Sequence, residues 1–301
     1  MLTPSFNLTL VAAFTALLAT SGPLHTAPPT PSPPPSDTAP APALLPPPPI
    51  SDYVREEIAG FSIAMHPSVS KLPQDVQGRL RTVLAYDLET IARTIPAPAL
   101  EAIRTITIAV TTDAHEMPGY ALHGACFHPS ADWLEQHHLS RDREGCVELL
   151  NVNEYLDWRA IQPAMVFHEL SHAYHWLIGF DRPDIDEAFA AARDSNSLYR
   201  SVPHTLNPKG PGQKAYALTD VHEYFAELSE AFFLRNDIFP FVRSELLAYD
   251  PRGAAVVEKV WNLPDSDLAG VISARRSAAA PSQKAPPQKD PSQKDLPQKD
   301  Q

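Results

Sequence analysis

The segment from Pro163 to Gly179 carries two histidines four residues apart, His168 and His172, within a periodic apolar pattern. Apolar side chains recur there at the spacing of one helix face, at Val166, Phe167, Leu170, Ala173, Tyr174 and Leu177. Proline is tolerated in a first helical turn and glycine often follows a last one. The pattern therefore predicts a helix over 163–178. Residues four apart lie on the same helix face, so both imidazoles point to one side.

Residues 168–172, His-Glu-Leu-Ser-His, fit a pattern that builds hydrolytic zinc sites. Two neutral imidazoles one turn apart can bind one Zn²⁺ at roughly 2.0–2.1 Å each. Glu169 follows the first histidine, where its carboxylate can take a proton from a water held by the ion. The alternative is a core helix that happens to contain histidines. A catalytic zinc usually has three protein ligands and an open position, so a third ligand is needed elsewhere.

His175 lies on the same face but about 10 Å along the axis from His168, at 1.5 Å per residue. That separation is too long for one ion, so we interpret His175 as a packing residue near the site. A second predicted helix, over 219–233, offers Glu223 and Glu227 beside an apolar stripe, with Thr219 or Asp220 as the N-cap. Either glutamate can reach the ion while the other hydrogen-bonds a ligand histidine.

These two segments together resemble the secreted lethal-factor-like metallopeptidases, a family that includes anthrax lethal factor and the Pro-Pro endopeptidases. The similarity spans residues 115–235 and is strongest in the His-Glu-Leu-Ser-His pentapeptide and in Tyr216-Ala-Leu-Thr-Asp-Val-His-Glu-Tyr-Phe-Ala-Glu227. The resemblance implies that Glu223 is the third zinc ligand. It also implies that Tyr216 donates a hydrogen bond to the developing oxyanion. Glu227 is then the residue expected to hydrogen-bond a ligand histidine, and His222 is expected to lie outside the site.

The two ends of the chain differ in composition from the middle. Residues 1–27 have no charged side chain and a short apolar run, which predicts a secretory signal peptide too short to span a membrane. The alternative is an uncleaved interfacial anchor. Residues 28–50 are rich in proline and predict an extended linker, and 271–301 repeat a polar Pro-Gln-Lys-Asp-like unit and predict a disordered tail. Residues 51–270 remain as one globular domain.

Charge and cysteine content limit the partners. The net charge is −12, which argues against binding the phosphate backbone of nucleic acids. Cys126 and Cys146 are the only cysteines, and in a secreted chain they predict one disulfide; the alternative is two buried thiols. We expect a monomer that binds protein or peptide substrates.

The order of the remaining segments predicts an α+β fold of the zincin-like type, with a small mixed sheet, the histidine helix and then the helix with the third ligand. The expected strand over 146–152 precedes the histidine helix, and we expect it to be the edge strand that borders the cleft. The other expected strands are 60–65, 104–111 and 120–127, and the other expected helices are 73–94, 186–193 and 239–249.

The leading hypothesis is a secreted zinc metalloendopeptidase of the gluzincin type, with one Zn²⁺ bound by His168, His172 and Glu223. Glu169 and Tyr216 are its expected catalytic residues. Two alternatives remain at this point. The chain is either a secreted binding or effector protein whose zinc site is structural or inactive, or a zinc hydrolase that acts on non-peptide amides.

Overall fold

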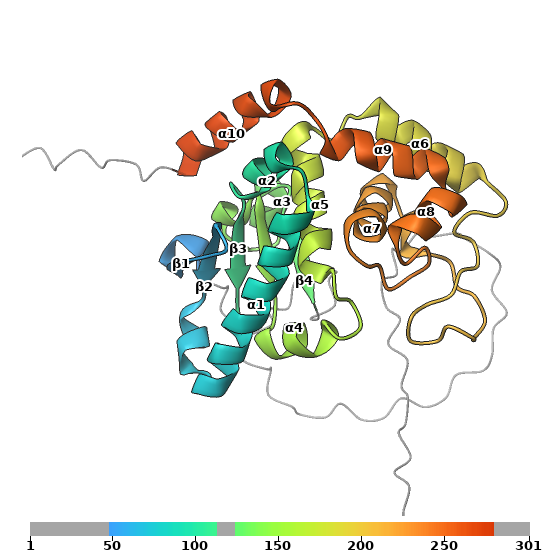
Figure 1. Ribbon diagram of the computed structural model, residues 1–301. Helices are drawn as coiled ribbons and strands as arrows, with labels where there is room; N and C mark the ends of the chain where they lie inside the picture. Colours follow the sequence, from blue (N-terminus) through green and yellow to red (C-terminus); the bar gives the residue numbers. More distant parts are fainter. Residues whose placement is uncertain (1–47, 113–123, 280–301) are drawn as a thin grey trace, which may run out of the picture.

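The computed structural model describes residues 48–112 and 124–279 of the 301-residue chain. The expected signal peptide, nearly all of the expected linker and residues 280–301 lie outside these ranges. Within the described residues the chain is α+β, as predicted, with ten α-helices and one mixed sheet of five strands. Figure 1 shows the sheet on one side of the molecule and a group of helices on the other.

The sheet has the order β1-β2-β3-β5-β4. Its strands are β1 (Val54–Ile58), β2 (Phe61–Met65), β3 (Thr107–Val110), β4 (Ala125–Phe127) and β5 (Cys146–Leu149). The three inner strands run parallel, whereas β1 pairs antiparallel with β2 and β4 antiparallel with β5. The prediction that 146–152 forms the edge strand is therefore wrong. β5 is an inner strand, and β4 occupies the edge on its side of the sheet.

Strand β1 was not predicted from the sequence. Its residues are Val-Arg-Glu-Glu-Ile and most are exposed, as expected of an edge strand, so they show no apolar alternation. The hairpin to β2 turns at Ala59 and Gly60, whose φ angles are 53° and 81°. Two consecutive positive φ angles define the tight hairpin turn that matches the twist of paired strands. A two-residue Ala-Gly turn is a weak signal, because alanine rarely adopts this conformation.

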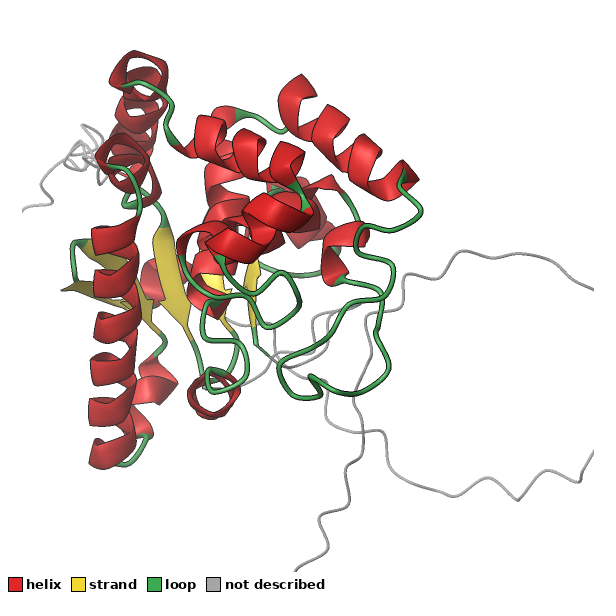
Figure 2. Cartoon of the chain, turned by 45° about the vertical axis from the view of Figure 1, so that its right-hand side comes forward, coloured by secondary structure: helices red, strands yellow, loops and turns green. Residues whose placement is uncertain are grey.

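The helices form two groups around the sheet. One face of the sheet is covered by α1 (Gln74–Thr94), α2 (Ala97–Ile103) and α5 (Met165–Ile178). Figure 2 shows helices in front of the strands. The other face carries a smaller apolar cluster and α3 (Ala131–Gln136). The remaining α-helices are α4 (Val152–Trp158), α6 (Pro183–Asp194), α7 (Val221–Phe233), α8 (Arg243–Tyr249), α9 (Pro251–Trp261) and α10 (Asp265–Ala279), and the 3₁₀ turns are η1 (Ile50–Asp52), η2 (Pro67–Lys71), η3 (Arg141–Arg143) and η4 (Tyr216–Leu218).

Helix α10 corrects the expected domain boundary at residue 270. It continues to Ala279, and Leu268 is buried while Val271 and Ile272 pack against the main core. The helix contacts α2 and α5. The polar repeats that suggested a disordered tail begin only after this helix, so residues 271–279 belong to the folded domain.

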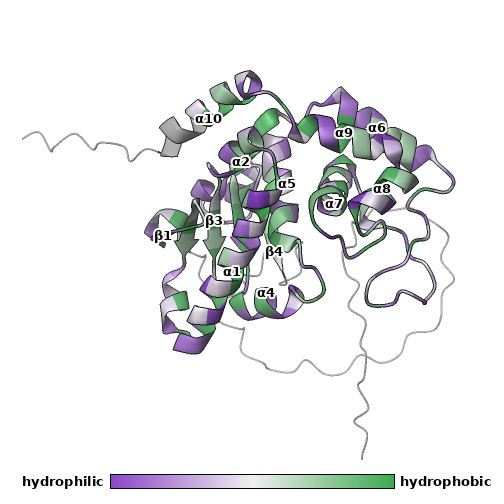
Figure 3. Cartoon of the chain, in the orientation of Figure 1, coloured by the Kyte–Doolittle hydropathy of each residue, from purple (hydrophilic) through white to green (hydrophobic). Residues whose placement is uncertain are grey.

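Trp261, at the end of α9, joins the two halves of the core. It is fully buried, stacks on Tyr174 of α5 with ring centroids 4.3 Å apart, and donates from Nε1 to Ser229 Oγ of α7 at 2.9 Å. In Figure 3, hydrophobic colour dominates α7 and much of α5, whereas α6 and α9 alternate with hydrophilic colour. Helices α5 and α7 are therefore interior helices. No helix within 48–112 or 124–279 is long and apolar enough to cross a bilayer.

The predicted disulfide is not formed. Cys126 and Cys146 are two buried thiols, which is the alternative considered above. The strand register explains this, because Cys126 on β4 pairs with Glu148 of β5. The Cys126 sulfur lies 3.6 Å from His128 Nε2, while the Cys146 sulfur contacts the Asp142 carbonyl at 3.8 Å. Burial raises the pKa of the Cys126 thiol, so it stays protonated and unreactive.

Glu148 of β5 is the centre of a buried ionic network. Its carboxylate accepts from Arg143 Nη1 at 2.5 Å and lies 2.8 Å from His128 Nε2, next to the edge strand. Arg143 also donates to the Tyr53 hydroxyl and the Pro48 carbonyl, both at 3.0 Å. Burial raises the pKa of Glu148, but the hydrogen bond with His128 and the charge of Arg143 lower it further, to about 2.

We expect Glu148→Gln to lower the free energy of unfolding by about 3–5 kcal/mol at pH 7, because it leaves the Arg143 charge buried without a partner. A carboxyl with a depressed pKa stabilises the fold fully above its ordinary value of 4.5 and loses this contribution as the pH falls towards 2. The difference from wild type should therefore shrink over that range. Urea unfolding at pH 7, 4.5 and 3 measures it, with exposed Glu89→Gln as control. A difference in the free energy of unfolding between wild type and Glu148→Gln that stays constant with pH would contradict this role of Glu148.

Gly253 allows α9 to approach α7 closely. A Cβ atom at Gly253 would lie 2.4 Å from both Leu228 Cδ2 and the Tyr224 hydroxyl, which itself donates to Asp250. We expect Gly253→Ala to lower the free energy of unfolding by about 1–3 kcal/mol through overpacking. The matched control is Gly78→Ala in α1, where nothing lies within 4 Å and a stabilisation of about 0.5–1 kcal/mol is expected. Thermal unfolding of both variants measures these two effects. Equal changes in stability for Gly253→Ala and Gly78→Ala would contradict the close approach at Gly253.

Candidate metal centre

Helix α5 presents both histidines of the pentapeptide to one side, as predicted. It ends at Gly179, whose φ of 91° fits the predicted glycine cap. His168 and His172 are partly buried, with 13 % and 14 % of their side chains exposed, and their ring centroids lie 4.7 Å apart. A helix whose opposite face is buried in the core thus holds two imidazoles in partly buried positions.

Helix α7 brings Glu223 to the same place. Asp220 is the N-cap, and its Oδ1 accepts from the backbone N–H groups of His222 at 2.8 Å and Glu223 at 3.0 Å. Glu223 Oε2 lies 3.0 Å from His168 Nε2 and 3.4 Å from His172 Nε2, and the two Nε2 atoms lie 3.1 Å apart. The structure therefore brings the three predicted ligands together from two helices, although His172 and Glu223 are 51 residues apart in the sequence.

These three atoms fit a tetrahedral divalent ion. Bonds of roughly 2.0–2.1 Å at tetrahedral angles separate ligand atoms by roughly 3.3 Å. The measured separations are 3.0, 3.1 and 3.4 Å, so an ion requires only small movements of the side chains. Two imidazole nitrogens and one carboxylate oxygen form a donor set that zinc accepts.

The electrostatics of the centre favour a cation. Burial raises the pKa of Glu223, but hydrogen bonds with His168 and His172 lower it further, well below its ordinary value. Its carboxylate is therefore ionised at neutral pH. Burial lowers the pKa of His168, but its contacts with Glu223 and Glu230 raise it further. A divalent ion bound between these groups would balance the negative charge of Glu223, which a proton on His168 otherwise balances.

Glu169 lies beside His168 on α5 and is partly buried. Burial raises its pKa, and the neighbouring charges of His168 and His172 oppose that rise. A carboxyl group whose pKa is raised towards neutrality is suited to accept a proton and release it again. The proton-transfer role expected of Glu169 from the sequence stays a prediction.

Tyr216 is also at the centre. It begins the short turn η4, and its hydroxyl donates to Glu223 Oε1 at 3.0 Å. Burial and the charge of Glu223 raise the pKa of this phenol, so it keeps its proton and remains a donor. The hydroxyl therefore lies against the expected third ligand. Its expected contact with an oxyanion stays a prediction.

The expected role of Glu227 is corrected by the structure. Glu230 Oε1 lies 2.6 Å from His168 Nδ1, whereas the nearest Glu227 oxygen lies 3.9 Å away. Glu230 was not singled out from the sequence. It follows Glu223 by seven residues, which is about two helical turns and places both on one face. That spacing was the available signal.

His175 and His222 lie outside the ligand set, as expected. The two rings contact each other with centroids 5.1 Å apart and pack on Phe180. His175 is fully buried, and burial with the nearby His222 lowers its pKa to about 3, so it is neutral. Both histidines are packing residues beside the centre.

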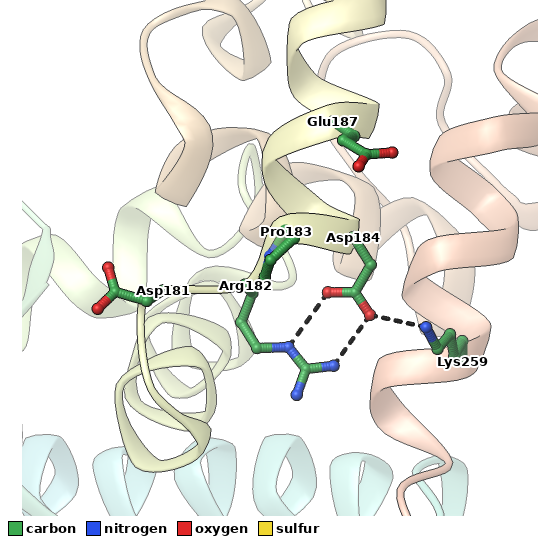
Figure 4. A pocket seen from close by; sticks show the side chains of 6 residues that line it. All are labelled: Asp181, Arg182, Pro183, Asp184, Glu187 and Lys259. Atoms are coloured by element: carbon green, nitrogen blue, oxygen red, sulfur yellow. Dashed lines mark hydrogen bonds and ion pairs between the residues drawn. The ribbon is translucent and has the colours of Figure 1, made fainter.

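A charged hollow at the start of α6 is separate from the metal centre. Figure 4 shows Asp184 in contact with both Arg182 and Lys259. Arg182 Nη2 and Lys259 Nζ each lie 3.0 Å from Asp184 Oδ2, so these charges satisfy one another. None of the ligand residues lines this hollow, which is bounded by Asp181, Arg182, Pro183, Asp184, Glu187 and Lys259.

Comparison with known proteins adds no further constraint: no family model, no curated protein and no solved structure matches this chain.

We expect the purified chain to bind one zinc ion, with a rise in thermal stability. Zinc at 100 times its Kd stabilises a folded state by about 2.7 kcal/mol. Glu223→Ala should abolish this rise because it removes one of three ligands. The matched control is His222→Ala, the neighbouring residue on α7, which should retain it. Calorimetric titration and thermal unfolding measure both effects. Zinc binding by Glu223→Ala equal to that of wild type would show that the ligand set is wrong.

Proposed function

We propose that this chain is a secreted zinc metalloendopeptidase with a zincin-like catalytic domain, related to the lethal-factor-like metallopeptidases. One observation carries the proposal: two histidines of α5 and Glu223 of α7 converge within 3.0–3.4 Å, with Glu169 beside them. The resemblance of both motif segments to that family supports it. The order of a mixed sheet, histidine helix and ligand helix supports the zincin-like fold.

In the proposed mechanism of peptide hydrolysis, each residue of the centre has a separate role. A zinc ion at this site would supply Lewis acidity towards a carbonyl oxygen and a water molecule. Glu169 accepts the proton of the attacking water on its carboxylate and delivers it to the leaving amine. Tyr216 turns its hydroxyl from Glu223 towards the tetrahedral oxygen and donates to it, which stabilises the developing charge. Glu223, His168 and His172 would hold the ion.

Strand β4 is the proposed site of substrate alignment. It is the sheet edge next to α5, and among the described strands it pairs only with β5. An extended peptide that adds to this edge would have its backbone fixed by main-chain hydrogen bonds. Its scissile bond would then pass along the helix that bears His168 and Glu169. Secretion is proposed from the charge-free apolar N-terminus.

We expect Glu169→Gln to lower kcat/KM by about 10²–10⁴-fold, the range of general acid–base catalysis, while zinc binding is retained. The measurement is cleavage profiling of peptide libraries by mass spectrometry with the zinc-loaded chain. The control is Glu187→Gln, an exposed α6 residue in the charged hollow, which should cleave like wild type. Unchanged proteolysis by Glu169→Gln would falsify the mechanism.

Two other outcomes separate the alternatives. Zinc binding by the wild type without cleavage of any library peptide would favour a secreted binding or effector protein with a structural site. Cleavage of small non-peptide amides alone would favour an amide hydrolase.

A further inference from the structure

Two buried acids lie behind His168, on the side away from the metal centre. Glu227 and Glu230 of α7 are 5 % and 3 % exposed, and both face the Nδ1 atom of His168. The opposite nitrogen, Nε2, faces Glu223 and His172. His168 is thus the only histidine of the pair with a carboxylate recorded at its second nitrogen among the described residues.

The two acids make different contacts. Glu230 Oε1 lies 2.6 Å from His168 Nδ1, which is a short charge-assisted hydrogen bond. Glu227 lies 3.9 Å from the same atom, beyond hydrogen-bond distance. Its carboxylate instead accepts from Asn236 Nδ2 at 3.0 Å, and Asn236 itself is 3 % exposed. A buried partner therefore holds Glu227 away from the histidine.

This contact decides which nitrogen of His168 carries the proton. A neutral imidazole has one N–H and one lone pair, and a metal ligand must offer the lone pair. When Glu230 accepts a hydrogen bond from Nδ1–H, the lone pair remains on Nε2, which points into the ligand set. In the other tautomer, an N–H would point at the ion and block the bond.

We propose that Glu230 is the positioning residue of the centre. It holds His168 in the Nδ1–H tautomer and in the ring orientation that metal binding requires, and Glu227 does not share this role. The inference rests on the proposed function only in taking zinc as the ion. It departs from the expectation that the acid four residues after Glu223 holds the histidine.

A competing arrangement uses the same atoms. His168 Nδ1, Glu227 and Glu230 lie close enough together to hold a second ion. That arrangement requires Nδ1 to give up its proton, because a nitrogen that binds an ion must offer its lone pair. The hydrogen bond of 2.6 Å favours the positioning role, and the metal stoichiometry distinguishes the two.

The test compares Glu230→Ala, Glu230→Gln and the matched variant Glu227→Gln in the full chain. Zinc affinity is measured by competition with a chromogenic chelator, without any peptide substrate. We expect Glu230→Ala to bind zinc about 10–100-fold more weakly, the usual effect of losing a ligand's outer partner. Glu230→Gln should lose about 3–10-fold, because an amide oxygen still accepts from Nδ1 but without charge. Glu227→Gln should stay within about twofold of wild type, because its carboxylate does not contact the ligand.

A second readout reports ligand geometry directly. Cobalt(II) replaces zinc in the same proteins, and its visible absorption bands should shift in both Glu230 variants but not in Glu227→Gln. Far-ultraviolet circular dichroism of the metal-free proteins checks their folding. If Glu230→Ala does not fold, the affinity and spectrum of Glu230→Gln decide the question.

Three results would overturn the proposal: wild-type zinc affinity with unchanged cobalt bands in the Glu230 variants, a larger loss in Glu227→Gln than in Glu230→Gln, or two zinc ions per wild-type chain. Failure of the proposed function looks different. In that case the wild type binds zinc and cleaves no peptide, while the affinity series still follows Glu230.

Discussion

The packing of α5 against α7 is the contact on which the candidate metal centre depends. A single helix cannot supply all three ligands, because residues beyond His172 rise too far along the axis. The two helices are held together by Trp261 of α9, which stacks on Tyr174 and hydrogen-bonds Ser229. This apolar contact lies on the faces of the helices turned away from the ligands. The burial of these aromatic side chains therefore sets the distances between the ligand atoms of His168, His172 and Glu223, which lie on two separate helices.

The interface between α5 and α7 also brings several carboxyl groups close together in a buried environment. Burial raises the pKa values of Glu169, Glu227 and Glu230, while the neighbouring histidines lower that of Glu223. Buried carboxyl groups this close to one another destabilise a folded domain unless protons or cations accompany them. A divalent ion at the proposed site, bound by Glu223 and the histidines, would supply that positive charge. The proposed metal binding would therefore also stabilise the fold.

The sheet contributes through its edge. Strand β4 has only three residues, yet it borders α5, and a buried network anchors it. His128 at its end contacts Glu148 of β5, which pairs with Arg143, and Arg143 binds the carbonyl of Pro48. One ionic cluster therefore connects the end of β4, strand β5 and the segment at Pro48, which are distant in the sequence. A strand edge held by buried contacts suits a surface that aligns an extended peptide.

The sequence by itself determined the features that depend on local spacing. The α+β class, both motif helices, the Gly179 cap, and the placing of His168 and His172 on one face all follow from periodicity and capping chemistry. The sequence limited the N-cap of the second helix to Thr219 or Asp220, and the structure selects Asp220. Only the tertiary structure decided which strand forms the edge, whether the cysteines bond, and which acid contacts His168. Each of these depends on strand order, register or helix rotation to within about an ångström. Those quantities arise from packing between distant segments, and local patterns in a single sequence do not predict them.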